Sequence, residues 1–321
     1  MAKMNLIPYK VEAIEDTAKE IPQGVQMIQA PDVWKQADKG SGNVIAIIDT
    51  GCDTDHPDLA GQVIDGKNFT GDGDDTDYDD ENGHGTHVAG TAAATASEDG
   101  ITGVAPNVKL LIVKVLDSNG SGDYQWIIDG IKYATDWEGP NGEKVRAISM
   151  SLGGPKDVPE LYEAVKRAID SGIPVVCAAG NEGDDRPETD EYAFPGAYNE
   201  VIQVGAINYN REIAPFSNTN NEIDIVAPGV DILSTYTEQK YARLSGTSMS
   251  APHVSGALAL VTSIAETQFD RKLTEGELYA QLVKRTVPLG YPKSAEGNGL
   301  IALDILNRFE KLFQSFNTFF K

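Results

Sequence analysis

The chain has 321 residues, of which 40% are apolar and 23% charged, and its 49 acidic and 26 basic side chains give a formal net charge of −23. This composition is that of a globular protein that buries a sizeable core without needing disulfides. Because so large a negative charge repels nucleic acid and anionic lipid, both are excluded as partners.

Targeting signals and cysteine usage indicate the compartment. The N-terminal segment lacks the apolar run of a signal peptide, and no stretch approaches the ~20 apolar residues of a membrane span. The two cysteines, Cys52 and Cys177, are too few for a disulfide framework. We therefore expect a cytoplasmic protein. The acidity itself has two compatible interpretations, which are solubility and carboxylates that hold calcium.

Along the chain, an N-terminal arm precedes a series of apolar runs. Residues 1–20 have little apolar periodicity and contain Pro8, so they are predicted to be an extended arm. From Ile21 onward the apolar runs are short, rich in β-branched residues and bounded by Gly, Asp or Pro, which is typical of strands buried on both faces. The predicted strands are residues 44–48, 110–115, 147–150, 175–179, 201–204 and 223–226.

Helix-length segments separate several of these strands. The predicted helices are residues 122–137, 156–171, 248–266 and 273–287. Alternation of strand and helix requires right-handed crossovers and a parallel sheet. The sequence therefore predicts an α/β fold, a doubly wound and mainly parallel sheet with helices on both faces. We expect a single domain over residues 21–300, between the arm (1–20) and a C-terminal tail (301–321). In such a sheet, ligands bind beyond the carboxyl ends of the strands.

Two polar motifs lie at such places in the first half of the chain. Asp49 ends the first strand in the sequence Ile-Ile-Asp-Thr-Gly-Cys, where it is either a turn residue or a buried carboxylate that reaches the active face. His84, in Asn-Gly-His-Gly-Thr-His-Val, is predicted to begin a helix, whose dipole disfavours an imidazolium unless a carboxylate such as Asp49 compensates. A zinc site using His84 and His87 is an alternative, although no His-Glu-x-x-His is present.

Two further motifs lie in the second half. Ser248, in Leu-Ser-Gly-Thr-Ser-Met-Ser-Ala-Pro-His, stands where a turn enters an apolar helix. It is either a helix cap or a nucleophile whose attack creates an oxyanion beside free helix N–H groups. Asn181 directly follows a predicted strand in Ala-Ala-Gly-Asn-Glu-Gly, so it is either a turn residue or a side-chain donor to that oxyanion.

Taken together, these motifs resemble those of the subtilisin-type serine proteases, or subtilases, over about residues 21–300. Asp49, His84 and Ser248 occur in the chain order of the subtilisin triad. The resemblance implies a serine endopeptidase in which Ser248 attacks the scissile carbonyl, His84 transfers the proton and Asp49 orients His84. It also implies an oxyanion hole of the Asn181 side chain and the Ser248 N–H. The family usually has Ala-Ser where this chain has Ser250-Ala251, but Ser250 would point about 200° away on a helix.

The same resemblance implies the substrate subsites. Substrate adds as a strand to two exposed backbone edges, which are Gly120, Ser121 and Gly122 on one side and Ser151, Leu152, Gly153 and Gly154 on the other. Leu152, Ala178, Ala179 and Ala193 line an apolar pocket for the residue before the cut, and Tyr124 and Ile127 help form a pocket further upstream. We expect broad specificity with a preference for large apolar or aromatic residues.

Calcium is the cofactor that the resemblance implies. Asp58 matches the carboxylate of a tight site, completed by the loop 95–101 through Thr95, Ser97, Asp99 and Ile101. Ser97 replaces the amide that is usual in that loop. Glu222 and Asp224 match a second, weaker cation site, with main-chain carbonyls near Gly196, Tyr198 and Val201. A solvated surface charge is the alternative for each of these acids.

Within the family, the sequence is most similar to the intracellular branch, which implies a homodimer that degrades cytoplasmic proteins. The arm then becomes a candidate inhibitor, because Leu6, Ile7, Pro8 and Tyr9 form an apolar patch in an otherwise polar segment. Laid across the cleft, it would act as a tethered pseudo-substrate that Pro8 keeps out of register. Its removal near residues 17–23 would activate the zymogen. A disordered end is the alternative for the arm, and a peptide-binding pseudoprotease is the alternative for the whole chain.

Overall fold

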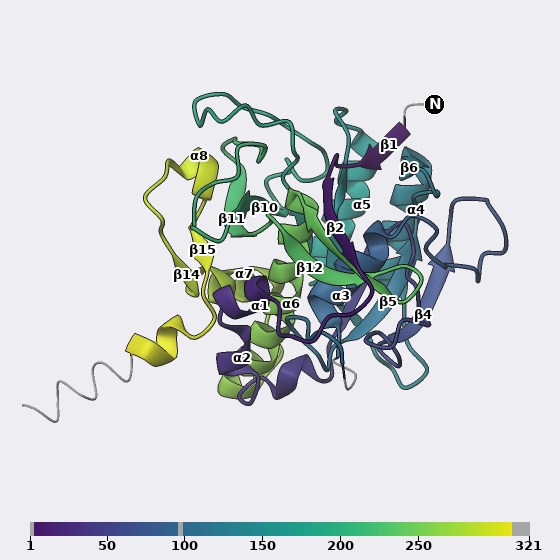
Figure 1. The fold of residues 1–321 in the computed structure, drawn as a ribbon, viewed down its shortest axis with the longest axis horizontal. Helices are drawn as coiled ribbons and strands as arrows, with labels where there is room; N and C mark the ends of the chain where they lie inside the picture. Colours follow the sequence, from purple (N-terminus) through teal and green to yellow (C-terminus); the bar gives the residue numbers. More distant parts are fainter. Residues whose placement is uncertain (1–2, 96–98, 310–321) are drawn as a thin grey trace, which may run out of the picture.

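The computed structural model describes residues 3–95 and 99–309, and it is built around a nine-stranded sheet (Figure 1). All neighbouring strands in this sheet are parallel except the edge pair β14–β15. Across the sheet the order is β14 (Thr286–Val287), β15 (Leu300–Ile301), β11 (Ile223–Pro228), β10 (Ile202–Ile207), β9 (Val175–Ala178), β7 (Val145–Met150), β3 (Val44–Asp49), β5 (Lys109–Lys114) and β4 (Val63–Asn68). The chain therefore leaves β3 toward one edge and later builds outward from its other side, so the end of β3 lies at the switch point where such sheets bind ligands.

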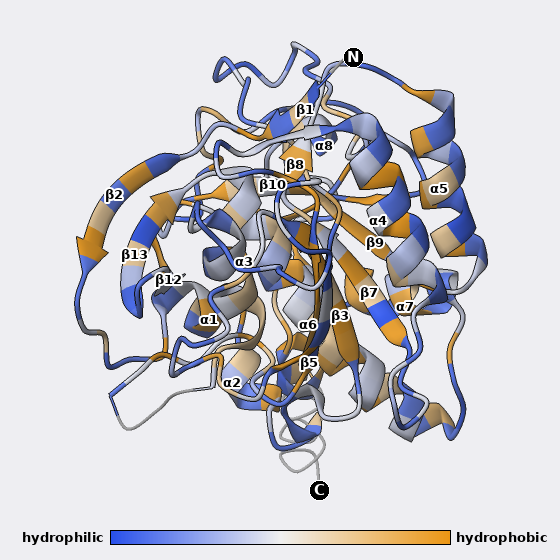
Figure 2. Ribbon diagram, turned by 90° about the vertical axis from the view of Figure 1, so that its right-hand side faces the viewer, coloured by the Kyte–Doolittle hydropathy of each residue, from blue (hydrophilic) through white to orange (hydrophobic). Residues whose placement is uncertain are grey.

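Helices cover both faces of this sheet. On one face lie α3 (His84–Ala93) and α6 (Thr247–Phe269), and on the other lie α4 (Tyr124–Asp136) and α5 (Pro159–Asp170). Figure 2 shows the apolar strands β3, β7 and β9 between these layers. The shorter helices are α1 (Gln23–Met27), α2 (Ala30–Val33), the 3₁₀ turn η1 (Asp38–Gly40), α7 (Glu275–Val283) and α8 (Lys293–Glu296).

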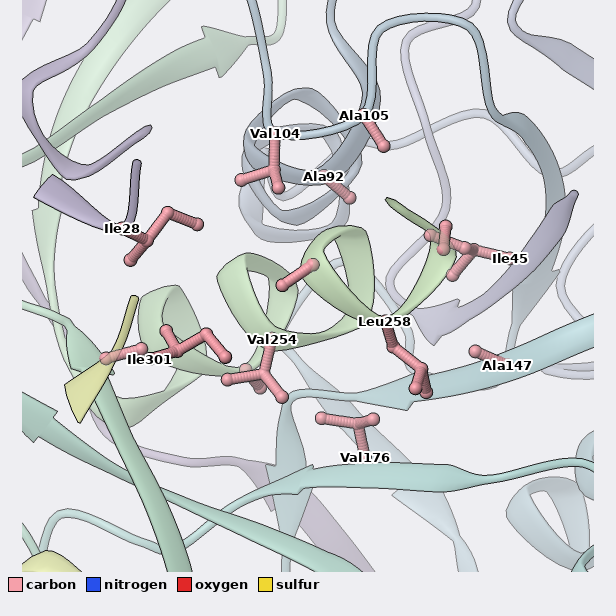
Figure 3. Close-up of a cluster of buried hydrophobic side chains, with 14 of the residues drawn as sticks. Ile28, Ile45, Ala92, Val104, Ala105, Ala147, Val176, Val254, Leu258 and Ile301 are labelled. Atoms are coloured by element: carbon pink, nitrogen blue, oxygen red, sulfur yellow. The ribbon is translucent and has the colours of Figure 1, made fainter. Parts of the chain in front are cut away.

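The core on the α6 side holds the helix that carries Ser248. Val254 and Leu258 of α6 lie in one buried cluster with Ile45, Ala147 and Val176 of the sheet (Figure 3). Because α6 is apolar nearly all round, it is buried along most of its length. The start of this helix is therefore fixed against the carboxyl ends of the strands.

Two small antiparallel sheets incorporate the N-terminal arm. In the first, β1 (Lys3–Leu6) lies between β6 (Ser121–Asp123) and β8 (Leu152–Gly153). In the second, β2 (Lys10–Glu15) pairs with β13 (Lys240–Ser245), which in turn pairs with β12 (Ile232–Tyr236). Figure 1 shows the purple β1 and β2 running over the front of the molecule. The arm is extended, and it is also packed, since Met4 and Ile7 are 0% and 2% exposed.

The six predicted strands correspond to β3, β5, β7, β9, β10 and β11, and the four predicted helices to α4, α5, α6 and α7. The helix expected over residues 273–287 ends at Val283, because residues 286–287 instead pair with β15. Cys52 and Cys177 are buried free thiols. Within the described ranges, no helix combines the length and apolarity needed to span a bilayer. Residues 310–321 of the predicted tail lie outside the described residues.

Candidate active site

Asp49 and His84 meet where β3 ends and α3 begins. His84 Nδ1 lies 2.7 Å from Asp49 Oδ1, and both side chains are almost fully buried. Asp49 Oδ1 also accepts the N–H of Thr50 at 2.8 Å. Gly83, just before His84, has φ of +97°, and a Cβ there would lie 2.4 Å from the Tyr236 ring, so the turn into α3 requires glycine. The geometry holds the imidazole with one nitrogen toward the carboxylate and the other free to exchange a proton.

Ser248 lies in the first turn of α6, directly after β13. Its Oγ donates to the Ser151 carbonyl at 3.2 Å, and Ser151 Oγ donates to the Ser248 carbonyl at 2.8 Å. His84 Nε2 has no hydrogen-bond partner among the residues described. The serine hydroxyl is therefore turned toward Ser151 rather than toward the histidine. Ser250 Oγ donates to the Ala227 carbonyl at 3.1 Å, on the sheet side of the helix, as its position two residues further along predicts.

The Asn181 amide is oriented by Thr247, the residue before Ser248. Asn181 Oδ1 accepts both the N–H and the hydroxyl of Thr247 at 2.9 Å. This leaves Asn181 Nδ2 as a donor directed at the cleft, where it lies 2.5 Å from the carbonyl of Pro8. Asn181 is thus placed to bind a carbonyl oxygen next to Ser248.

The two backbone edges named from the sequence form the walls of a cleft that the arm fills. Residues 3–5 pair with 121–123, and residues 5–6 pair with 152–153. The Leu6 N–H donates to the Gly120 carbonyl at 2.8 Å. Gly120 has φ of +71°, and a Cβ there would lie 2.5 Å from the Leu6 side chain, so glycine permits this close approach. An extended peptide therefore fits here as the middle strand of a sheet.

Apolar arm side chains lie in the predicted pockets. Met4 belongs to the same buried cluster as Tyr124, Ile127 and Leu152. Ile7 lies beside Gly153, whose position is also in contact with Ala193. Ala178 and Ala179 follow in β9 and just after it, both buried.

Tyr9 covers the histidine. The ring centroids of Tyr9 and His84 are 4.9 Å apart, and Tyr9 Oη donates to Asn82 Oδ1 at 3.3 Å. Burial raises the pKa of Tyr9, so its phenol remains a donor. The other histidine of the motif, His87, is buried and its pKa falls to about 3, while its Nε2 donates to the carbonyls of Ile232 and Ala242. His87 thus joins α3 to the β12–β13 hairpin.

Comparison with known proteins decides the family. The sequence model of the Subtilase family matches residues 40–300. An intracellular serine protease of Paenibacillus polymyxa is 58% identical over 315 residues, which are 98% of this chain and 94% of that protein. The major intracellular serine protease of Bacillus subtilis (strain 168) is 55% identical over 304 residues, 94% of this chain and 93% of that protein. Subtilisin DY of Bacillus licheniformis is 46% identical over 247 residues, 77% and 86% of the two chains. The chain belongs to the subtilase family.

This subtilase is a serine endopeptidase, which confirms the enzyme class and the α/β fold predicted from the sequence. The match to the Paenibacillus protein covers 98% of the chain, so it includes most of the arm. The family model begins only at residue 40. Most of the arm is therefore matched by the Paenibacillus protein but lies outside the region that the family model covers.

Sequence reasoning missed two residues of this subtilase's site. Met4 was absent from the predicted apolar patch, although it stands two residues before Leu6, the spacing of one face of a strand. Asp80 lies in an acid-rich stretch, residues 71–81, and unlike most of that stretch it is buried, 4% exposed, and accepts five hydrogen bonds. No local pattern distinguishes a buried Asp from its exposed neighbours.

The structure groups some of the predicted calcium ligands. Asp58 is fully buried, and its Oδ2 accepts from the Ile101 N–H at 2.8 Å and from Tyr241 Oη at 2.9 Å. The N–H of Thr95 donates to the Asp58 carbonyl at 2.8 Å. Asp99 instead pairs with Lys19 of the arm, and Ser97 lies outside the described residues.

At the second predicted cation site, Asp224 Oδ2 accepts from the Gln203 N–H and Oδ1 from Tyr279 Oη. Burial raises the Asp224 pKa to about 6. Gly196 and the buried Tyr198 and Val201 lie on the loop before β10, and Glu222 immediately precedes β11. Among the described residues, no three His, Cys, Asp or Glu side chains converge in the manner of a metal cluster. Oxygen donors from the main chain would have to complete either site.

Proposed function

We propose that Asp49, His84 and Ser248 are the catalytic triad of this endopeptidase. The observation that carries the proposal is the 2.7 Å contact of two buried side chains, His84 Nδ1 and Asp49 Oδ1. Tyr9, whose ring lies over His84, also lies against Gly246 at the start of α6. Asp49 would fix the tautomer of His84 so that Nε2 takes the proton of Ser248 and later gives it to the leaving amine. The carbonyl carbon is attacked by Ser248 Oγ, and an acyl-enzyme forms and is hydrolysed by water.

The oxyanion of each tetrahedral intermediate would be held by Asn181 Nδ2 and the Ser248 N–H. The support is the orientation of the Asn181 amide, whose oxygen is occupied by Thr247, so that its N–H₂ group must face the cleft. Donors fixed in place before the reaction need no reorganisation when the charge develops, and such donors are among the most effective features of acyl-transfer enzymes.

The arm would act as an internal inhibitor that makes the full chain a zymogen. It fills the cleft as a strand, and its Tyr9 ring lies over His84. Ile7 lies at the pocket assigned to the residue before the cut, yet the carbonyl at Asn181 belongs to Pro8. In a substrate, the side chain in that pocket and the carbonyl at the oxyanion hole belong to the same residue. The arm is therefore one residue out of register for attack.

The position of Ser248 supports the same conclusion. Its hydroxyl donates to Ser151 instead of His84, so no activated nucleophile faces the arm. Departure of the arm would let the hydroxyl rotate toward His84 Nε2. Because the inhibitor is tethered, its high effective concentration makes even a modest affinity sufficient.

Substrates would be proteins of the cell interior, cut with broad specificity for large apolar residues. Support comes from two relatives named as intracellular serine proteases and from the apolar side chains, Met4 and Ile7, that occupy the two pockets. A homodimer, implied by the family resemblance, remains a prediction that sedimentation equilibrium would test.

The proposal is tested by comparing three proteins on one peptide substrate. These are the full chain, a chain that begins at Ile21, and a full chain with Ile7→Glu, in which a charge replaces the buried side chain. We expect both altered proteins to be much more active than the full chain. Equal activity of all three proteins would contradict inhibition by the arm. If a serine-directed phosphonyl reagent left the peptide cleavage by all three proteins uninhibited, that result would contradict the triad.

Calcium at Asp58 is a further part of the proposal. Carboxylate and carbonyl oxygens suit calcium, and Asp58 is fully buried beside the loop predicted to complete the site. Calcium that binds only the folded state raises the melting temperature by mass action. The calcium-induced shift, measured against chelator, should be lost in Asp58→Ala; an undiminished shift would remove Asp58 from the site.

A further inference from the structure

Asp80 is a buried carboxylate in the loop before His84 that the catalytic proposal does not use. Its Oδ1 accepts from Thr50 Oγ1 (2.8 Å), the Asn82 N–H (3.0 Å) and the Gly83 N–H (2.9 Å). Its Oδ2 accepts from the Thr86 N–H (2.8 Å) and Thr86 Oγ1 (2.6 Å). Hydrogen bonds to an ionised acceptor are stronger than neutral ones, and an anion favours a helix N-terminus. Asp80 therefore fixes the first turn of α3, the helix that begins at His84.

Thr50 connects Asp80 to Asp49. The Thr50 N–H donates to Asp49 Oδ1, and the Thr50 hydroxyl donates to Asp80 and accepts from the Gly85 N–H at 2.9 Å. One side chain thus joins the end of β3, which carries Asp49, to the first turn of the helix that carries His84. Because Thr50 is 0% exposed, water does not compete for these bonds.

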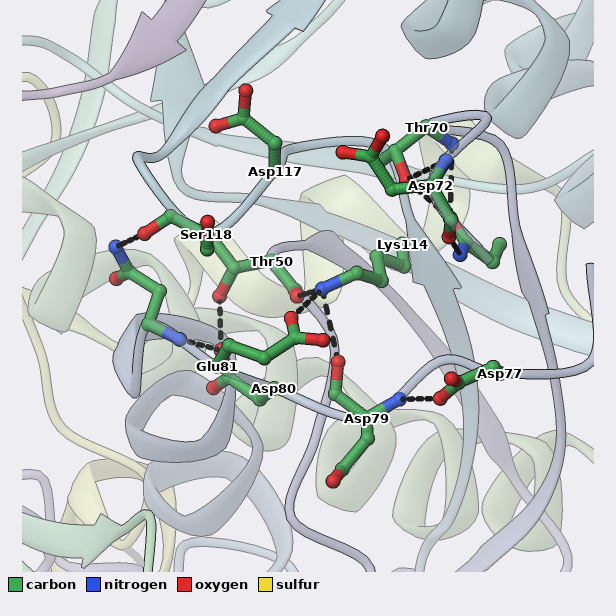
Figure 4. A network of polar contacts seen from close by, with 12 residues as sticks. Thr50, Thr70, Asp72, Asp77, Asp79, Asp80, Glu81, Lys114, Asp117 and Ser118 are labelled. Carbon is green, nitrogen blue, oxygen red and sulfur yellow. Dashed lines mark hydrogen bonds and ion pairs between the residues drawn. The ribbon is translucent and has the colours of Figure 1, made fainter. Parts of the chain in front are cut away.

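Lys114 of β5 holds Thr50 by its carbonyl. This lysine is 3% exposed, and its Nζ donates to the Thr50 carbonyl (2.6 Å), the Asp79 carbonyl (2.9 Å) and Glu81 Oε2 (2.7 Å). All three ammonium hydrogens are used, as a buried cation requires. Figure 4 shows Thr50 between Lys114 and Asp80, with the loop residues Asp79 and Glu81 completing the ring of contacts.

We infer that Asp80 and Lys114 are positioning residues for catalysis, which set the spacing of Asp49 and His84 through Thr50. The inference rests on the proposed roles of Asp49 and His84. A misplacement of about 1 Å can lower turnover by about 10². The arm, which marks the substrate path, pairs with β6 and β8 and makes no hydrogen bond to Asp80 within residues 3–95 and 99–309. Loosening this network should therefore change turnover and spare substrate binding.

The first test is spectroscopic and needs neither activity nor release of the arm. In the full chain with Ser248→Ala, the proton between His84 Nδ1 and Asp49 should give a sharp, far-downfield proton resonance. Adding Asp80→Asn keeps the size of the side chain but turns an N–H₂ group toward hydrogen-bond donors, so we expect this resonance to broaden or vanish. Asp72→Asn is the matched control, because it removes the same charge from an exposed residue of the same loop.

The second test is kinetic, in full chains that carry Ile7→Glu. Asp80→Asn should lower kcat by roughly 10² with KM changed less than about twofold. Thr50→Val should do the same, and Thr50→Ser, which keeps the hydroxyl, should retain turnover. If Asp80→Asn fails to fold, the comparison of Thr50→Val with Thr50→Ser tests the inference instead. If Ile7→Glu proves no more active than wild type, inhibition by the arm fails and the same comparison is made with the native arm. An unchanged resonance and kcat in Asp80→Asn, or equal kcat in Thr50→Val and Thr50→Ser, would overturn the inference.

Discussion

Ser248 and Ser250 lie two residues apart on α6 and point to different parts of the molecule. Ser248 Oγ contacts the cleft residue Ser151, whereas Ser250 Oγ donates to the Ala227 carbonyl at the end of β11. We expect Ser248→Ala to lower turnover by about 10⁶, the cost known for the nucleophile of subtilisin, and Ser250→Ala to retain most of it. Assays use the chain that begins at Ile21, with circular dichroism as the control for folding. The reverse pattern would assign the nucleophile to Ser250.

Asn181 is the second residue whose role a single substitution tests. Asn181→Leu removes the Nδ2 donor, so turnover should fall by about 10²–10³, the cost known for the oxyanion-hole amide of subtilisin, with little change in KM. The variant also leaves the Thr247 N–H and hydroxyl without their acceptor, so its melting temperature is measured as the control for structural damage. Steady-state kinetics on one peptide substrate measure the turnover and the KM. Unchanged turnover in Asn181→Leu would remove the side chain from the oxyanion hole.

Among the secondary-structure elements, those predicted well from the sequence are the ones with a strong local signal. The buried parallel strands appear as unbroken apolar runs, and Val44–Asp49 ends at the residue that the motif singles out. The pairing of β2 with β13 had no such signal, because residues 10–15 are half charged and mostly exposed, and their partner lies more than 200 residues away. Asp80 was missed for the same reason, since its burial depends on Thr50 and Thr86 rather than on its neighbours in the loop.

The strand β2 provides the arm with a second anchor, centred on Arg243. Arg243 Nε lies 2.7 Å from Glu15 and its Nη2 lies 3.3 Å from Glu20, both in the arm. Partly exposed ion pairs contribute about 0.3–1 kcal/mol each. Because Arg243→Gln removes two such pairs, we expect it to raise the activity of the full chain roughly three- to thirtyfold, and we expect activity to rise less steeply with salt in the variant than in the wild type.

Arg146→Gln is the matched control for this prediction. Arg146 is a similarly shielded arginine that pairs with Glu266, away from the arm. It should leave both the activity and its salt dependence unchanged. The chain that begins at Ile21 should be insensitive to Arg243→Gln, because it has no arm to hold. Equal activity of the full chain with and without Arg243→Gln at low salt would show that the ion pairs do not retain the arm.

For the molecule as a whole, burial of histidines contributes to the loss of stability in acid. All four histidines, His56, His84, His87 and His253, are buried. Burial lowers the pKa of His56, and it lowers the pKa of His87 to about 3 and of His253 to about 4. Because the unfolded chain binds protons at these sites that the folded chain does not, acid favours unfolding.

His253 offers the clearest separate test of this effect. Its Nδ1 donates to the Met249 carbonyl at 2.8 Å, and Nε2 has no partner within the described ranges and faces Gly24, where a Cβ would lie only 2.4 Å away. Protonation of Nε2 would place a buried charge there without an acceptor. With an unfolded pKa of 6.5 and a folded pKa of about 4, the stability due to the neutral form is complete above pH 6.5 and is lost as the pH falls toward 4. The full loss is of the order of 3 kcal/mol.

His253→Gln removes this titration. The unfolding free energy of the variant should therefore fall less between pH 7 and pH 4.5 than that of the protein with His253. The measurement is urea unfolding at several pH values, with Ser248→Ala in both proteins to prevent self-digestion. Gln also changes the packing against Gly24, which shifts the unfolding free energy by the same amount at every pH. The two proteins are therefore compared by the slope of unfolding free energy against pH and not by its absolute value. His87 keeps its own titration in both proteins and leaves a residual slope. Parallel curves for the two proteins would show that His253 is protonated as readily in the folded chain as in the unfolded chain.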